Sequence, residues 1–225
     1  MRTHLERDLE FLKKEILTMG SMVEDAAAKA IGSLLNRRTD LAEEVLAGDD
    51  KIDAKELDLE DECLKTLALH QPVAGDLRFI TAILKVTNDL ERMGDLAMHI
   101  ARRAAFLAAE APIGTPKGFE EMAELVQTMV AYSLDALVRR DADLAKRVCE
   151  MDDRVDELYW ENYRELLERM RKEPEIIDRA FQTISACSRL ERIADLATNI
   201  AEDIYFMVKG KVIKHMLKTE GLEDN

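Results

Sequence analysis

Apolar residues recur along most of the chain at alternating spacings of three and four, which is the period of an amphipathic α-helix. The first such series is Leu5, Leu9, Leu12, Ile16, Met19, Val23, Ala26 and Ala30. A second series with the same spacing runs from Ile83 to Leu107. The periodicity along the whole chain predicts six long helices, over about residues 3–35, 41–69, 74–107, 118–139, 141–171 and 175–208. Since no alternating run predicts a strand, we expect an all-α fold.

Helix breakers separate the periodic stretches. The polar segment 36–40 ends the first helix, and Pro72 ends the second because proline disfavours helix in the residue before it. The densest group of breakers lies at the midpoint of the chain and comprises Pro112, Gly114, Pro116 and Gly118. We therefore place the boundary between two halves at this point.

The two halves repeat each other in sequence. Residues 90–101 align with residues 190–201, and eight of these twelve positions are identical. Residues 49–53 align in the same way with residues 152–156. Such self-similarity indicates an internal duplication, and three helices in each half can close as a small bundle. The sequence thus predicts two tandem three-helix bundles, over residues 1–111 and 112–210, followed by an acidic tail over residues 211–225.

The excess of acidic over basic residues argues against some classes of binding partner. The chain has 46 acidic and 32 basic residues, which gives a formal net charge of −14. This argues against nucleic acid as a partner, because duplex binding relies on basic contacts to phosphate. The three widely spaced cysteines indicate buried thiols rather than disulfides or a thiolate metal site. With neither a signal peptide nor a bilayer-spanning apolar run, we expect a soluble cytoplasmic protein without direct membrane insertion.

The candidate chemistry lies in four carboxylate pairs, each with its members four residues apart on one helix face. Like charges at this spacing repel by about 0.2–0.5 kcal/mol, and a bound cation would turn that repulsion into attraction. Each pair lies beside the apolar seam of its helix, so pairs from neighbouring helices could converge on a surface metal. Arg92 and Arg192 could orient these carboxylates. The candidate metal ligands are Asp49, Asp53, Glu91, Asp95, Asp152, Asp156, Glu191 and Asp195.

Other interpretations of these residues stay open. An acidic protein exposes carboxylates to solvent without binding a metal, and a duplication can repeat them by ancestry alone. His99, one turn beyond Asp95, could reach a metal but is more often a surface or packing residue. The sequence contains no nucleophile elbow, phosphate loop, dinucleotide fingerprint or His-Glu-x-x-His motif, so we do not expect an enzyme. The remaining alternatives are a metal-dependent hydrolase and a metal-free helical scaffold.

These motifs resemble those of the PhoU family. Residues 71–78, Gln-Pro-Val-Ala-Gly-Asp-Leu-Arg, are similar to the family's Gln-Pro-x-Ala-x-Asp-Leu-Arg sequence at the turn into the third helix. The Leu-Glu-Arg-x-x-Asp core occurs twice, and all four carboxylate pairs match the family's Glu(Asp)-x-x-x-Asp element. Two departures are His99, where the family often has asparagine, and Ala194, where the first half has Gly94. They make equal metal affinity at the two sites doubtful.

The resemblance implies a fold, a cofactor and a set of partners. The fold would be two packed three-helix bundles with pseudo-two-fold symmetry, and the cofactor would be multinuclear iron or zinc on the bundle surface. The protein would be a homodimer and a cytoplasmic regulator between a phosphate ABC transporter and a sensor histidine kinase. Its expected partners are the transporter's ATPase subunit and the kinase, which it would help to hold in a repressing mode when phosphate is plentiful.

Overall fold

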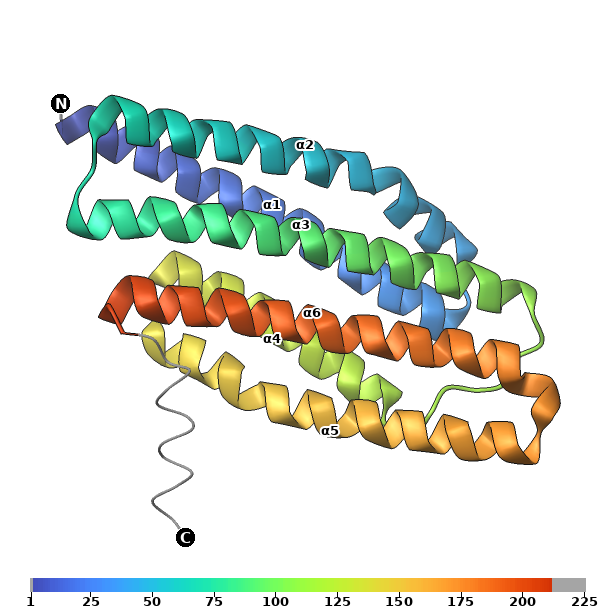
Figure 1. Cartoon of the computed structure of the whole chain (residues 1–225). Helices are drawn as coiled ribbons and strands as arrows, with labels where there is room; N and C mark the ends of the chain where they lie inside the picture. Colours follow the sequence, from blue (N-terminus) through green and yellow to red (C-terminus); the bar gives the residue numbers. More distant parts are fainter. Residues whose placement is uncertain (1, 212–225) are drawn as a thin grey trace, which may run out of the picture.

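The computed structural model describes residues 2–211, and this part of the chain folds into helices without any strand. The described residues form six long helices and one short 3-10 turn, and Figure 1 shows how the helices are arranged. Their bounds are α1 Arg2–Asn36, α2 Thr39–His70, α3 Ala74–Ala109, α4 Phe119–Arg139, α5 Ala142–Lys172, η1 Pro174–Ile176 and α6 Ile177–Lys209. Every long helix begins and ends within two residues of its predicted position. The predicted acidic tail lies outside the described residues, except for Lys211.

Local signals in the sequence explain several of the helix ends. α2 ends at Gln71, which takes the left-handed conformation (φ 46°) and donates its N–H to the last turn of the helix. α5 begins after Asp141, whose side chain accepts hydrogen bonds of 3.0 Å from the backbone N–H groups of Asp143 and Leu144. α6 ends at Gly210 (φ 67°), where glycine takes the left-handed conformation at little cost.

The helices form two three-helix bundles that pack against each other. α1, α2 and α3 make the first bundle, α4, α5 and α6 make the second, and α3 and α6 lie side by side through the middle (Figure 1). α3 and α6 run antiparallel. At one end of their contact Lys85 Nζ donates to Asp203 Oδ1 (2.6 Å), and at the other Arg103 Nε donates to Ser185 Oγ (3.3 Å). We call this contact the α3–α6 seam. The predicted pair of tandem bundles is thus confirmed.

One apolar core runs through both bundles. Its buried side chains come from all six long helices and include Leu12, Leu59, Leu90, Met129, Val155 and Leu190. The two bundles are therefore in direct apolar contact and are not separated by a solvent layer. A non-helical link, residues 110–118, joins them along the chain. The predicted boundary between residues 111 and 112 falls in this link and stays a prediction.

The three cysteines are buried thiols, as the sequence predicted. Cys63, Cys149 and Cys187 are free and buried, and burial raises the pKa of each thiol to about 12. Such thiols are protonated at neutral pH and are poor nucleophiles and metal ligands. Within residues 2–211, none of the helices is both long and apolar enough to cross a membrane.

Candidate metal centres

Two of the predicted carboxylate pairs face each other across α2 and α3. These helices are joined by a short turn and run antiparallel, which brings Asp49 and Asp53 opposite Asp95 and Glu91 (Figure 1). Burial, and then the charges of Asp53 and Asp95, raise the pKa of Asp49. Burial, and then Asp95 and its acidic neighbours, raise the pKa of Glu91 to about 7. We call these four carboxylates the first acidic group.

The other two pairs face each other across α5 and α6 in the same way. Burial, and then Asp195 and Asp156, raise the pKa of Glu191 to about 7. Burial and Asp156 raise the pKa of Asp152 to about 6, although a hydrogen bond from Thr198 Oγ1 (3.2 Å) opposes the shift. These four carboxylates form the second acidic group.

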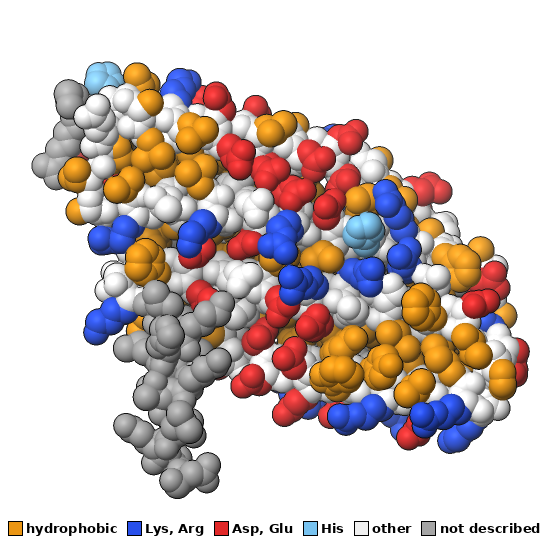
Figure 2. Space-filling view, viewed as in Figure 1, with side chains coloured by type: hydrophobic (Ala, Val, Ile, Leu, Met, Phe, Trp, Pro, Cys, Tyr) orange, Lys and Arg blue, Asp and Glu red, His pale blue; other side chains and the backbone are white. Residues whose placement is uncertain are grey.

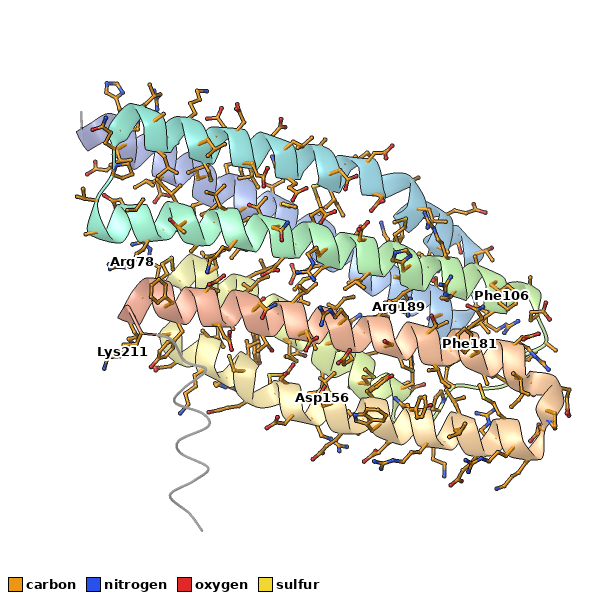
Figure 3. All side chains as sticks on the ribbon, viewed as in Figure 1. Arg78, Phe106, Asp156, Phe181, Arg189 and Lys211 are labelled. Atoms are coloured by element: carbon orange, nitrogen blue, oxygen red, sulfur yellow. The ribbon has the colours of Figure 1, made fainter. Side chains whose placement is uncertain are left out.

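Both groups lie on the flanks of their bundles, as the sequence predicted. Asp53 and Asp156 are exposed, and the other six carboxylates are half-buried. Figure 2 shows acidic side chains gathered over α2 and α3 and again over α5 and α6, with a row of basic side chains between them. Asp156, labelled in Figure 3, lies on α5 where this helix faces α6. The duplication in the sequence is therefore also a duplication of surface chemistry.

A fifth carboxylate, Glu56, belongs to the first acidic group and was missed in the sequence. Burial is the largest cause that raises its pKa, and Asp53 and Asp95 contribute, while a hydrogen bond from Asn88 lowers it. Glu56 lies three residues after Asp53, on the same face of α2. The internal repeat gave no signal for it, because its counterpart in α5 is Tyr159.

The helices approach each other differently in the two groups. A Cβ atom on Gly94 would lie 3.1 Å from the Ile52 side chain, so this glycine lets α2 pack closely on α3. In α6 the equivalent residue, Ala194, is fully buried and carries the extra methyl group. The spacing of the two helices around each group therefore need not be equal, which gives a physical reason to expect unequal affinities.

The two arginines next to the glutamates also differ. Arg192 forms an ion pair with Asp195 at 2.8 Å, so it contacts a candidate ligand as expected. Arg92 instead lies 3.6 Å from Asp89, which is not one of the candidate ligands. The predicted role of arginine in orienting the carboxylates is therefore supported by a direct contact in the second acidic group, between Arg192 and Asp195, and not by the contact of Arg92 with Asp89.

The side chains of both acidic groups are chemically suited to bind a metal ion. All candidate ligands are carboxylates, whose oxygen atoms bind hard or borderline cations, and a bound cation would offset the repulsion between them. In residues 2–211, however, no three His, Cys, Asp or Glu side chains converge closely enough to hold one ion. His99 joins no such set either. The arrangement thus supplies facing oxygen donors, and binding would require these side chains to move closer together.

Comparison with known proteins identifies the family of this chain. Residues 16–104 and 119–204 each match the PhoU domain, so the match covers most of the chain and occurs once in each half. The chain belongs to the PhoU family.

Relatives in the PhoU family extend over nearly the whole chain. A protein of Aquifex aeolicus named phosphate-specific transport system accessory protein PhoU homolog is 42% identical, and the alignment covers 96% of this chain and 99% of the relative. A protein of the same name from Pseudomonas aeruginosa is 40% identical, with coverage of 96% and 90%.

Solved PhoU structures share the fold. The crystal structure of PhoU from Pseudomonas aeruginosa matches with a TM-score of 0.87 and 40% identity, over 92% of this chain and 99% of that one. PhoU from Streptococcus pneumoniae, described as a phosphate transport system regulatory protein, matches with a TM-score of 0.86 and 28% identity, over 92% and 98%. These matches confirm the predicted family and fold.

The family sequence at residues 71–78 has a clear structural position. Its first residue, Gln71, ends α2, and Ala74 begins α3 with a positive φ of 47°. Its last residue, Arg78, donates a hydrogen bond from Nε to the backbone carbonyl of Met207 in α6 (3.3 Å). The motif therefore shapes the turn between two helices of the first bundle and also ties that bundle to the second.

Proposed function

We propose that this protein is an accessory regulator of phosphate uptake that links a phosphate ABC transporter to a sensor histidine kinase. It contacts the transporter's ATPase subunit and the kinase on the cytoplasmic side, and it holds the kinase in a repressing mode when phosphate is plentiful. The observation that carries this proposal is the match of both halves to the PhoU domain, together with relatives named as accessory proteins of phosphate-specific transport. The homodimer implied by the resemblance is part of the proposal.

Deletion of the gene tests the regulatory role. Without the repressing contact the kinase stays active, so alkaline phosphatase is expected to rise in phosphate-rich medium. Expression of the wild-type chain from a plasmid should restore the low level. Unchanged phosphatase in the deletion strain, together with no binding of purified chain to the ATPase subunit or the kinase, would overturn the proposal.

The two acidic groups are the proposed sites for iron or zinc. Their support is chemical: each group places four carboxylates on two facing helices, and burial, followed by the charges of neighbouring carboxylates, raises several carboxyl pKa values. A divalent or trivalent cation bound there would neutralise the crowded charges and hold α2 to α3, or α5 to α6. Glu56 is a further candidate ligand in the first acidic group.

Metal content provides the test for these sites. Protein purified without chelator or affinity tag is expected to carry several equivalents of iron or zinc. The amount should fall by about half when the first group is removed by Asp49→Asn, Asp53→Asn, Glu91→Gln and Asp95→Asn. A matched control neutralises four exposed acidic residues of α2 outside the group: Glu43→Gln, Glu44→Gln, Asp58→Asn and Asp61→Asn. Equal loss in both variants, or no metal in the wild type after reconstitution, would reject the assignment.

A further inference from the structure

The two ends of the α3–α6 seam carry opposite charge. The duplication pairs each α3 residue with the α6 residue one hundred positions later, so Lys85 corresponds to Ser185, Asp89 to Arg189 and Arg103 to Asp203. Among these repeat-related positions, Lys85, Asp89 and Asp203 at one end have a summed formal charge of −1. Those at the opposite end, Ser185, Arg189 and Arg103, sum to +2. The repeat thus preserves the geometry of the seam while reversing its charge.

The contacts at the two ends differ accordingly. At the first end Lys85 is neutralised by its ion pair with Asp203 (2.6 Å). At the other end both arginines bond Ser185 instead: Arg103 Nε donates to its Oγ (3.3 Å), and Arg189 Nη1 donates to its backbone carbonyl (3.1 Å). Both arginines thus direct a side-chain N–H to Ser185 rather than to a carboxylate. Two half-buried guanidinium groups therefore each donate one hydrogen bond to Ser185. Their remaining N–H groups are available to an acidic partner.

Exposed aromatic side chains border this arginine pair. Phe106 on α3 and Phe181 on α6 lie at the same end of the seam as Arg189, whereas Arg78 lies at the other end (Figure 3). Phe106 is 42% exposed and Phe181 is 61% exposed. Figure 2 shows that the apolar surface continues from here over α5 and α6, where Trp160 and Ile177 are also exposed. We call Arg103, Arg189, Phe106, Phe181, Trp160 and Ile177 the arginine–aromatic surface.

The equivalent surface of the first bundle has a different composition. Leu57 replaces Trp160, Leu77 replaces Ile177 and Thr81 replaces Phe181. Phe106 alone keeps an aromatic counterpart, Phe206, which is 41% exposed. Aromatic residues and arginine are the types most enriched at the centres of protein interfaces, whereas a lone anion site needs no aromatic border. The combination is therefore typical of a surface that binds another protein. The other end of the seam keeps Phe206 but has Thr81 and Leu57 in place of Phe181 and Trp160.

We propose that the arginine–aromatic surface binds a segment of a partner protein that carries both acidic and apolar side chains. Acidic side chains of this segment pair with the free donors of Arg103 and Arg189, because guanidinium groups match carboxylates in charge and in fork geometry. Its apolar side chains cover Phe106, Phe181 and Trp160. On a chain with a net charge of −14, this local positive charge directs an acidic partner to one place. The inference rests on the proposed adaptor role, since it names the surface that role would use.

The test measures binding of the full-length chain to the purified ATPase subunit and to the purified cytoplasmic part of the kinase from the same organism. Arg103→Gln/Arg189→Gln is expected to weaken binding to at least one of them about tenfold or more, mainly through slower association. Phe181→Ala should weaken the same complex about fivefold or more through faster dissociation. The matched control is Lys14→Gln/Lys51→Gln, which removes the same charge at exposed positions of α1 and α2 and should change affinity less than threefold.

The possible outcomes are distinct. Wild-type affinity in Arg103→Gln/Arg189→Gln, or equal loss in the control pair, would overturn the inference and leave the adaptor role standing. No binding of the wild-type chain to either partner would overturn the adaptor role and the inference with it. Binding to vesicles that contain phosphatidylglycerol, lost in Arg103→Gln/Arg189→Gln, would assign the surface to an anionic membrane and so reject a protein partner. Unchanged helical circular dichroism and melting temperature in each variant ensure that lost contacts, not unfolding, cause the effect.

Discussion

At the scale of single residues, folding disfavours the ionised form of the two glutamates in the acidic groups, Glu91 and Glu191. Glu91 and Glu191 are partly removed from water and face other carboxylates, which raises the pKa of each to about 7 from an ordinary 4.5. A carboxyl group whose pKa is raised by folding binds its proton more tightly in the folded chain than in the unfolded one. The stabilisation from this proton is fully present below pH 4.5 and is lost as the pH rises through about 7.

We therefore expect Glu91→Gln/Glu191→Gln to stabilise the metal-free protein in a pH-dependent way. Glutamine keeps the shape and the neutral charge of the protonated acid, so the variant should melt close to the wild type at pH 4.5 in the presence of a chelator. Its advantage in melting temperature should grow as the pH rises towards 7 and become constant above pH 8.

Thermal melts across this pH range check the prediction. The exposed pair Glu43→Gln/Glu168→Gln, on α2 and α5, controls for the loss of two negative charges elsewhere on the protein. An advantage that does not change with pH, or one shared by the control, would show that the site glutamates are not perturbed.

At the scale of helices, the sequence contained most of the architecture. The apolar period and the breakers at Pro72 and 112–118 predicted every long helix within two residues, because a helix needs only local spacing and local end signals. The duplication predicted that the carboxylate pairs recur. The apolar residue next to each pair, such as Ile52 before Asp53, predicted that the pairs lie on the flank of each helix, where the structure places them.

The pairing of helices could not be predicted from local spacing. Opposition of Asp49 to Asp95 depends on the register between α2 and α3, which is set by packing such as that of Ile52 against Gly94. Glu56 was missed because the repeat replaces it with Tyr159. Arg103 and Arg189 were not predicted as a site for a similar reason. They differ from their counterparts in the repeat, and only the packing of α3 on α6 places them on the same serine.

Two glycines in helices are expected to respond in opposite directions to alanine. A Cβ atom on Gly20 in α1 would lie 2.8 Å from the buried Leu134 side chain in α4, whereas one on Gly48 in α2 would meet nothing within 4 Å. Gly48→Ala should raise the free energy of unfolding by about 0.5–1 kcal/mol, because glycine is a poor helix former. Gly20→Ala should lower it, since overpacking costs about 1–3 kcal/mol and exceeds that gain.

Denaturant unfolding of both variants measures these changes. The Gly20→Ala/Leu134→Ala double variant isolates the contact, because removing Leu134 removes the clash. The two substitutions should therefore cost less together than the sum of their separate costs, by about 0.5–3 kcal/mol. If Gly20→Ala stabilises the protein as Gly48→Ala does, Leu134 moves aside freely and α1 and α4 are not tightly packed here.

At the scale of the whole molecule, the two bundles differ in surface and share an interior. The acidic groups repeat, the ends of the α3–α6 seam differ in charge, and most buried apolar side chains nevertheless form one cluster across all six long helices. A change at a site in one bundle can therefore alter the stability of the other through packing. An adaptor that contacts two partners would use such coupling, because binding on one bundle then has an energetic route to the second.

A substitution confined to α2 tests this coupling. Leu59 in α2 is 2% exposed, and α2 packs against α1 and α3 in its own bundle. Leu59→Ala should cost about 2–5 kcal/mol, which lowers the melting temperature by roughly 5–15 °C in a chain of this size. Leu57→Ala, two residues away and 65% exposed, is the matched control and should cost little.

The only tryptophan of the chain allows unfolding of the second bundle to be followed separately in the Leu59→Ala variant. Trp160 lies on α5, packs against Tyr159 and Tyr163, and so reports the second bundle by fluorescence, while circular dichroism reports all helices. If the shared core makes the molecule unfold as one unit, Leu59→Ala should shift the fluorescence and dichroism midpoints equally. A fluorescence midpoint that stays at the wild-type temperature while the dichroism separates into two steps would show that the bundles unfold independently. The energetic route between the two partners would then have to run outside the core.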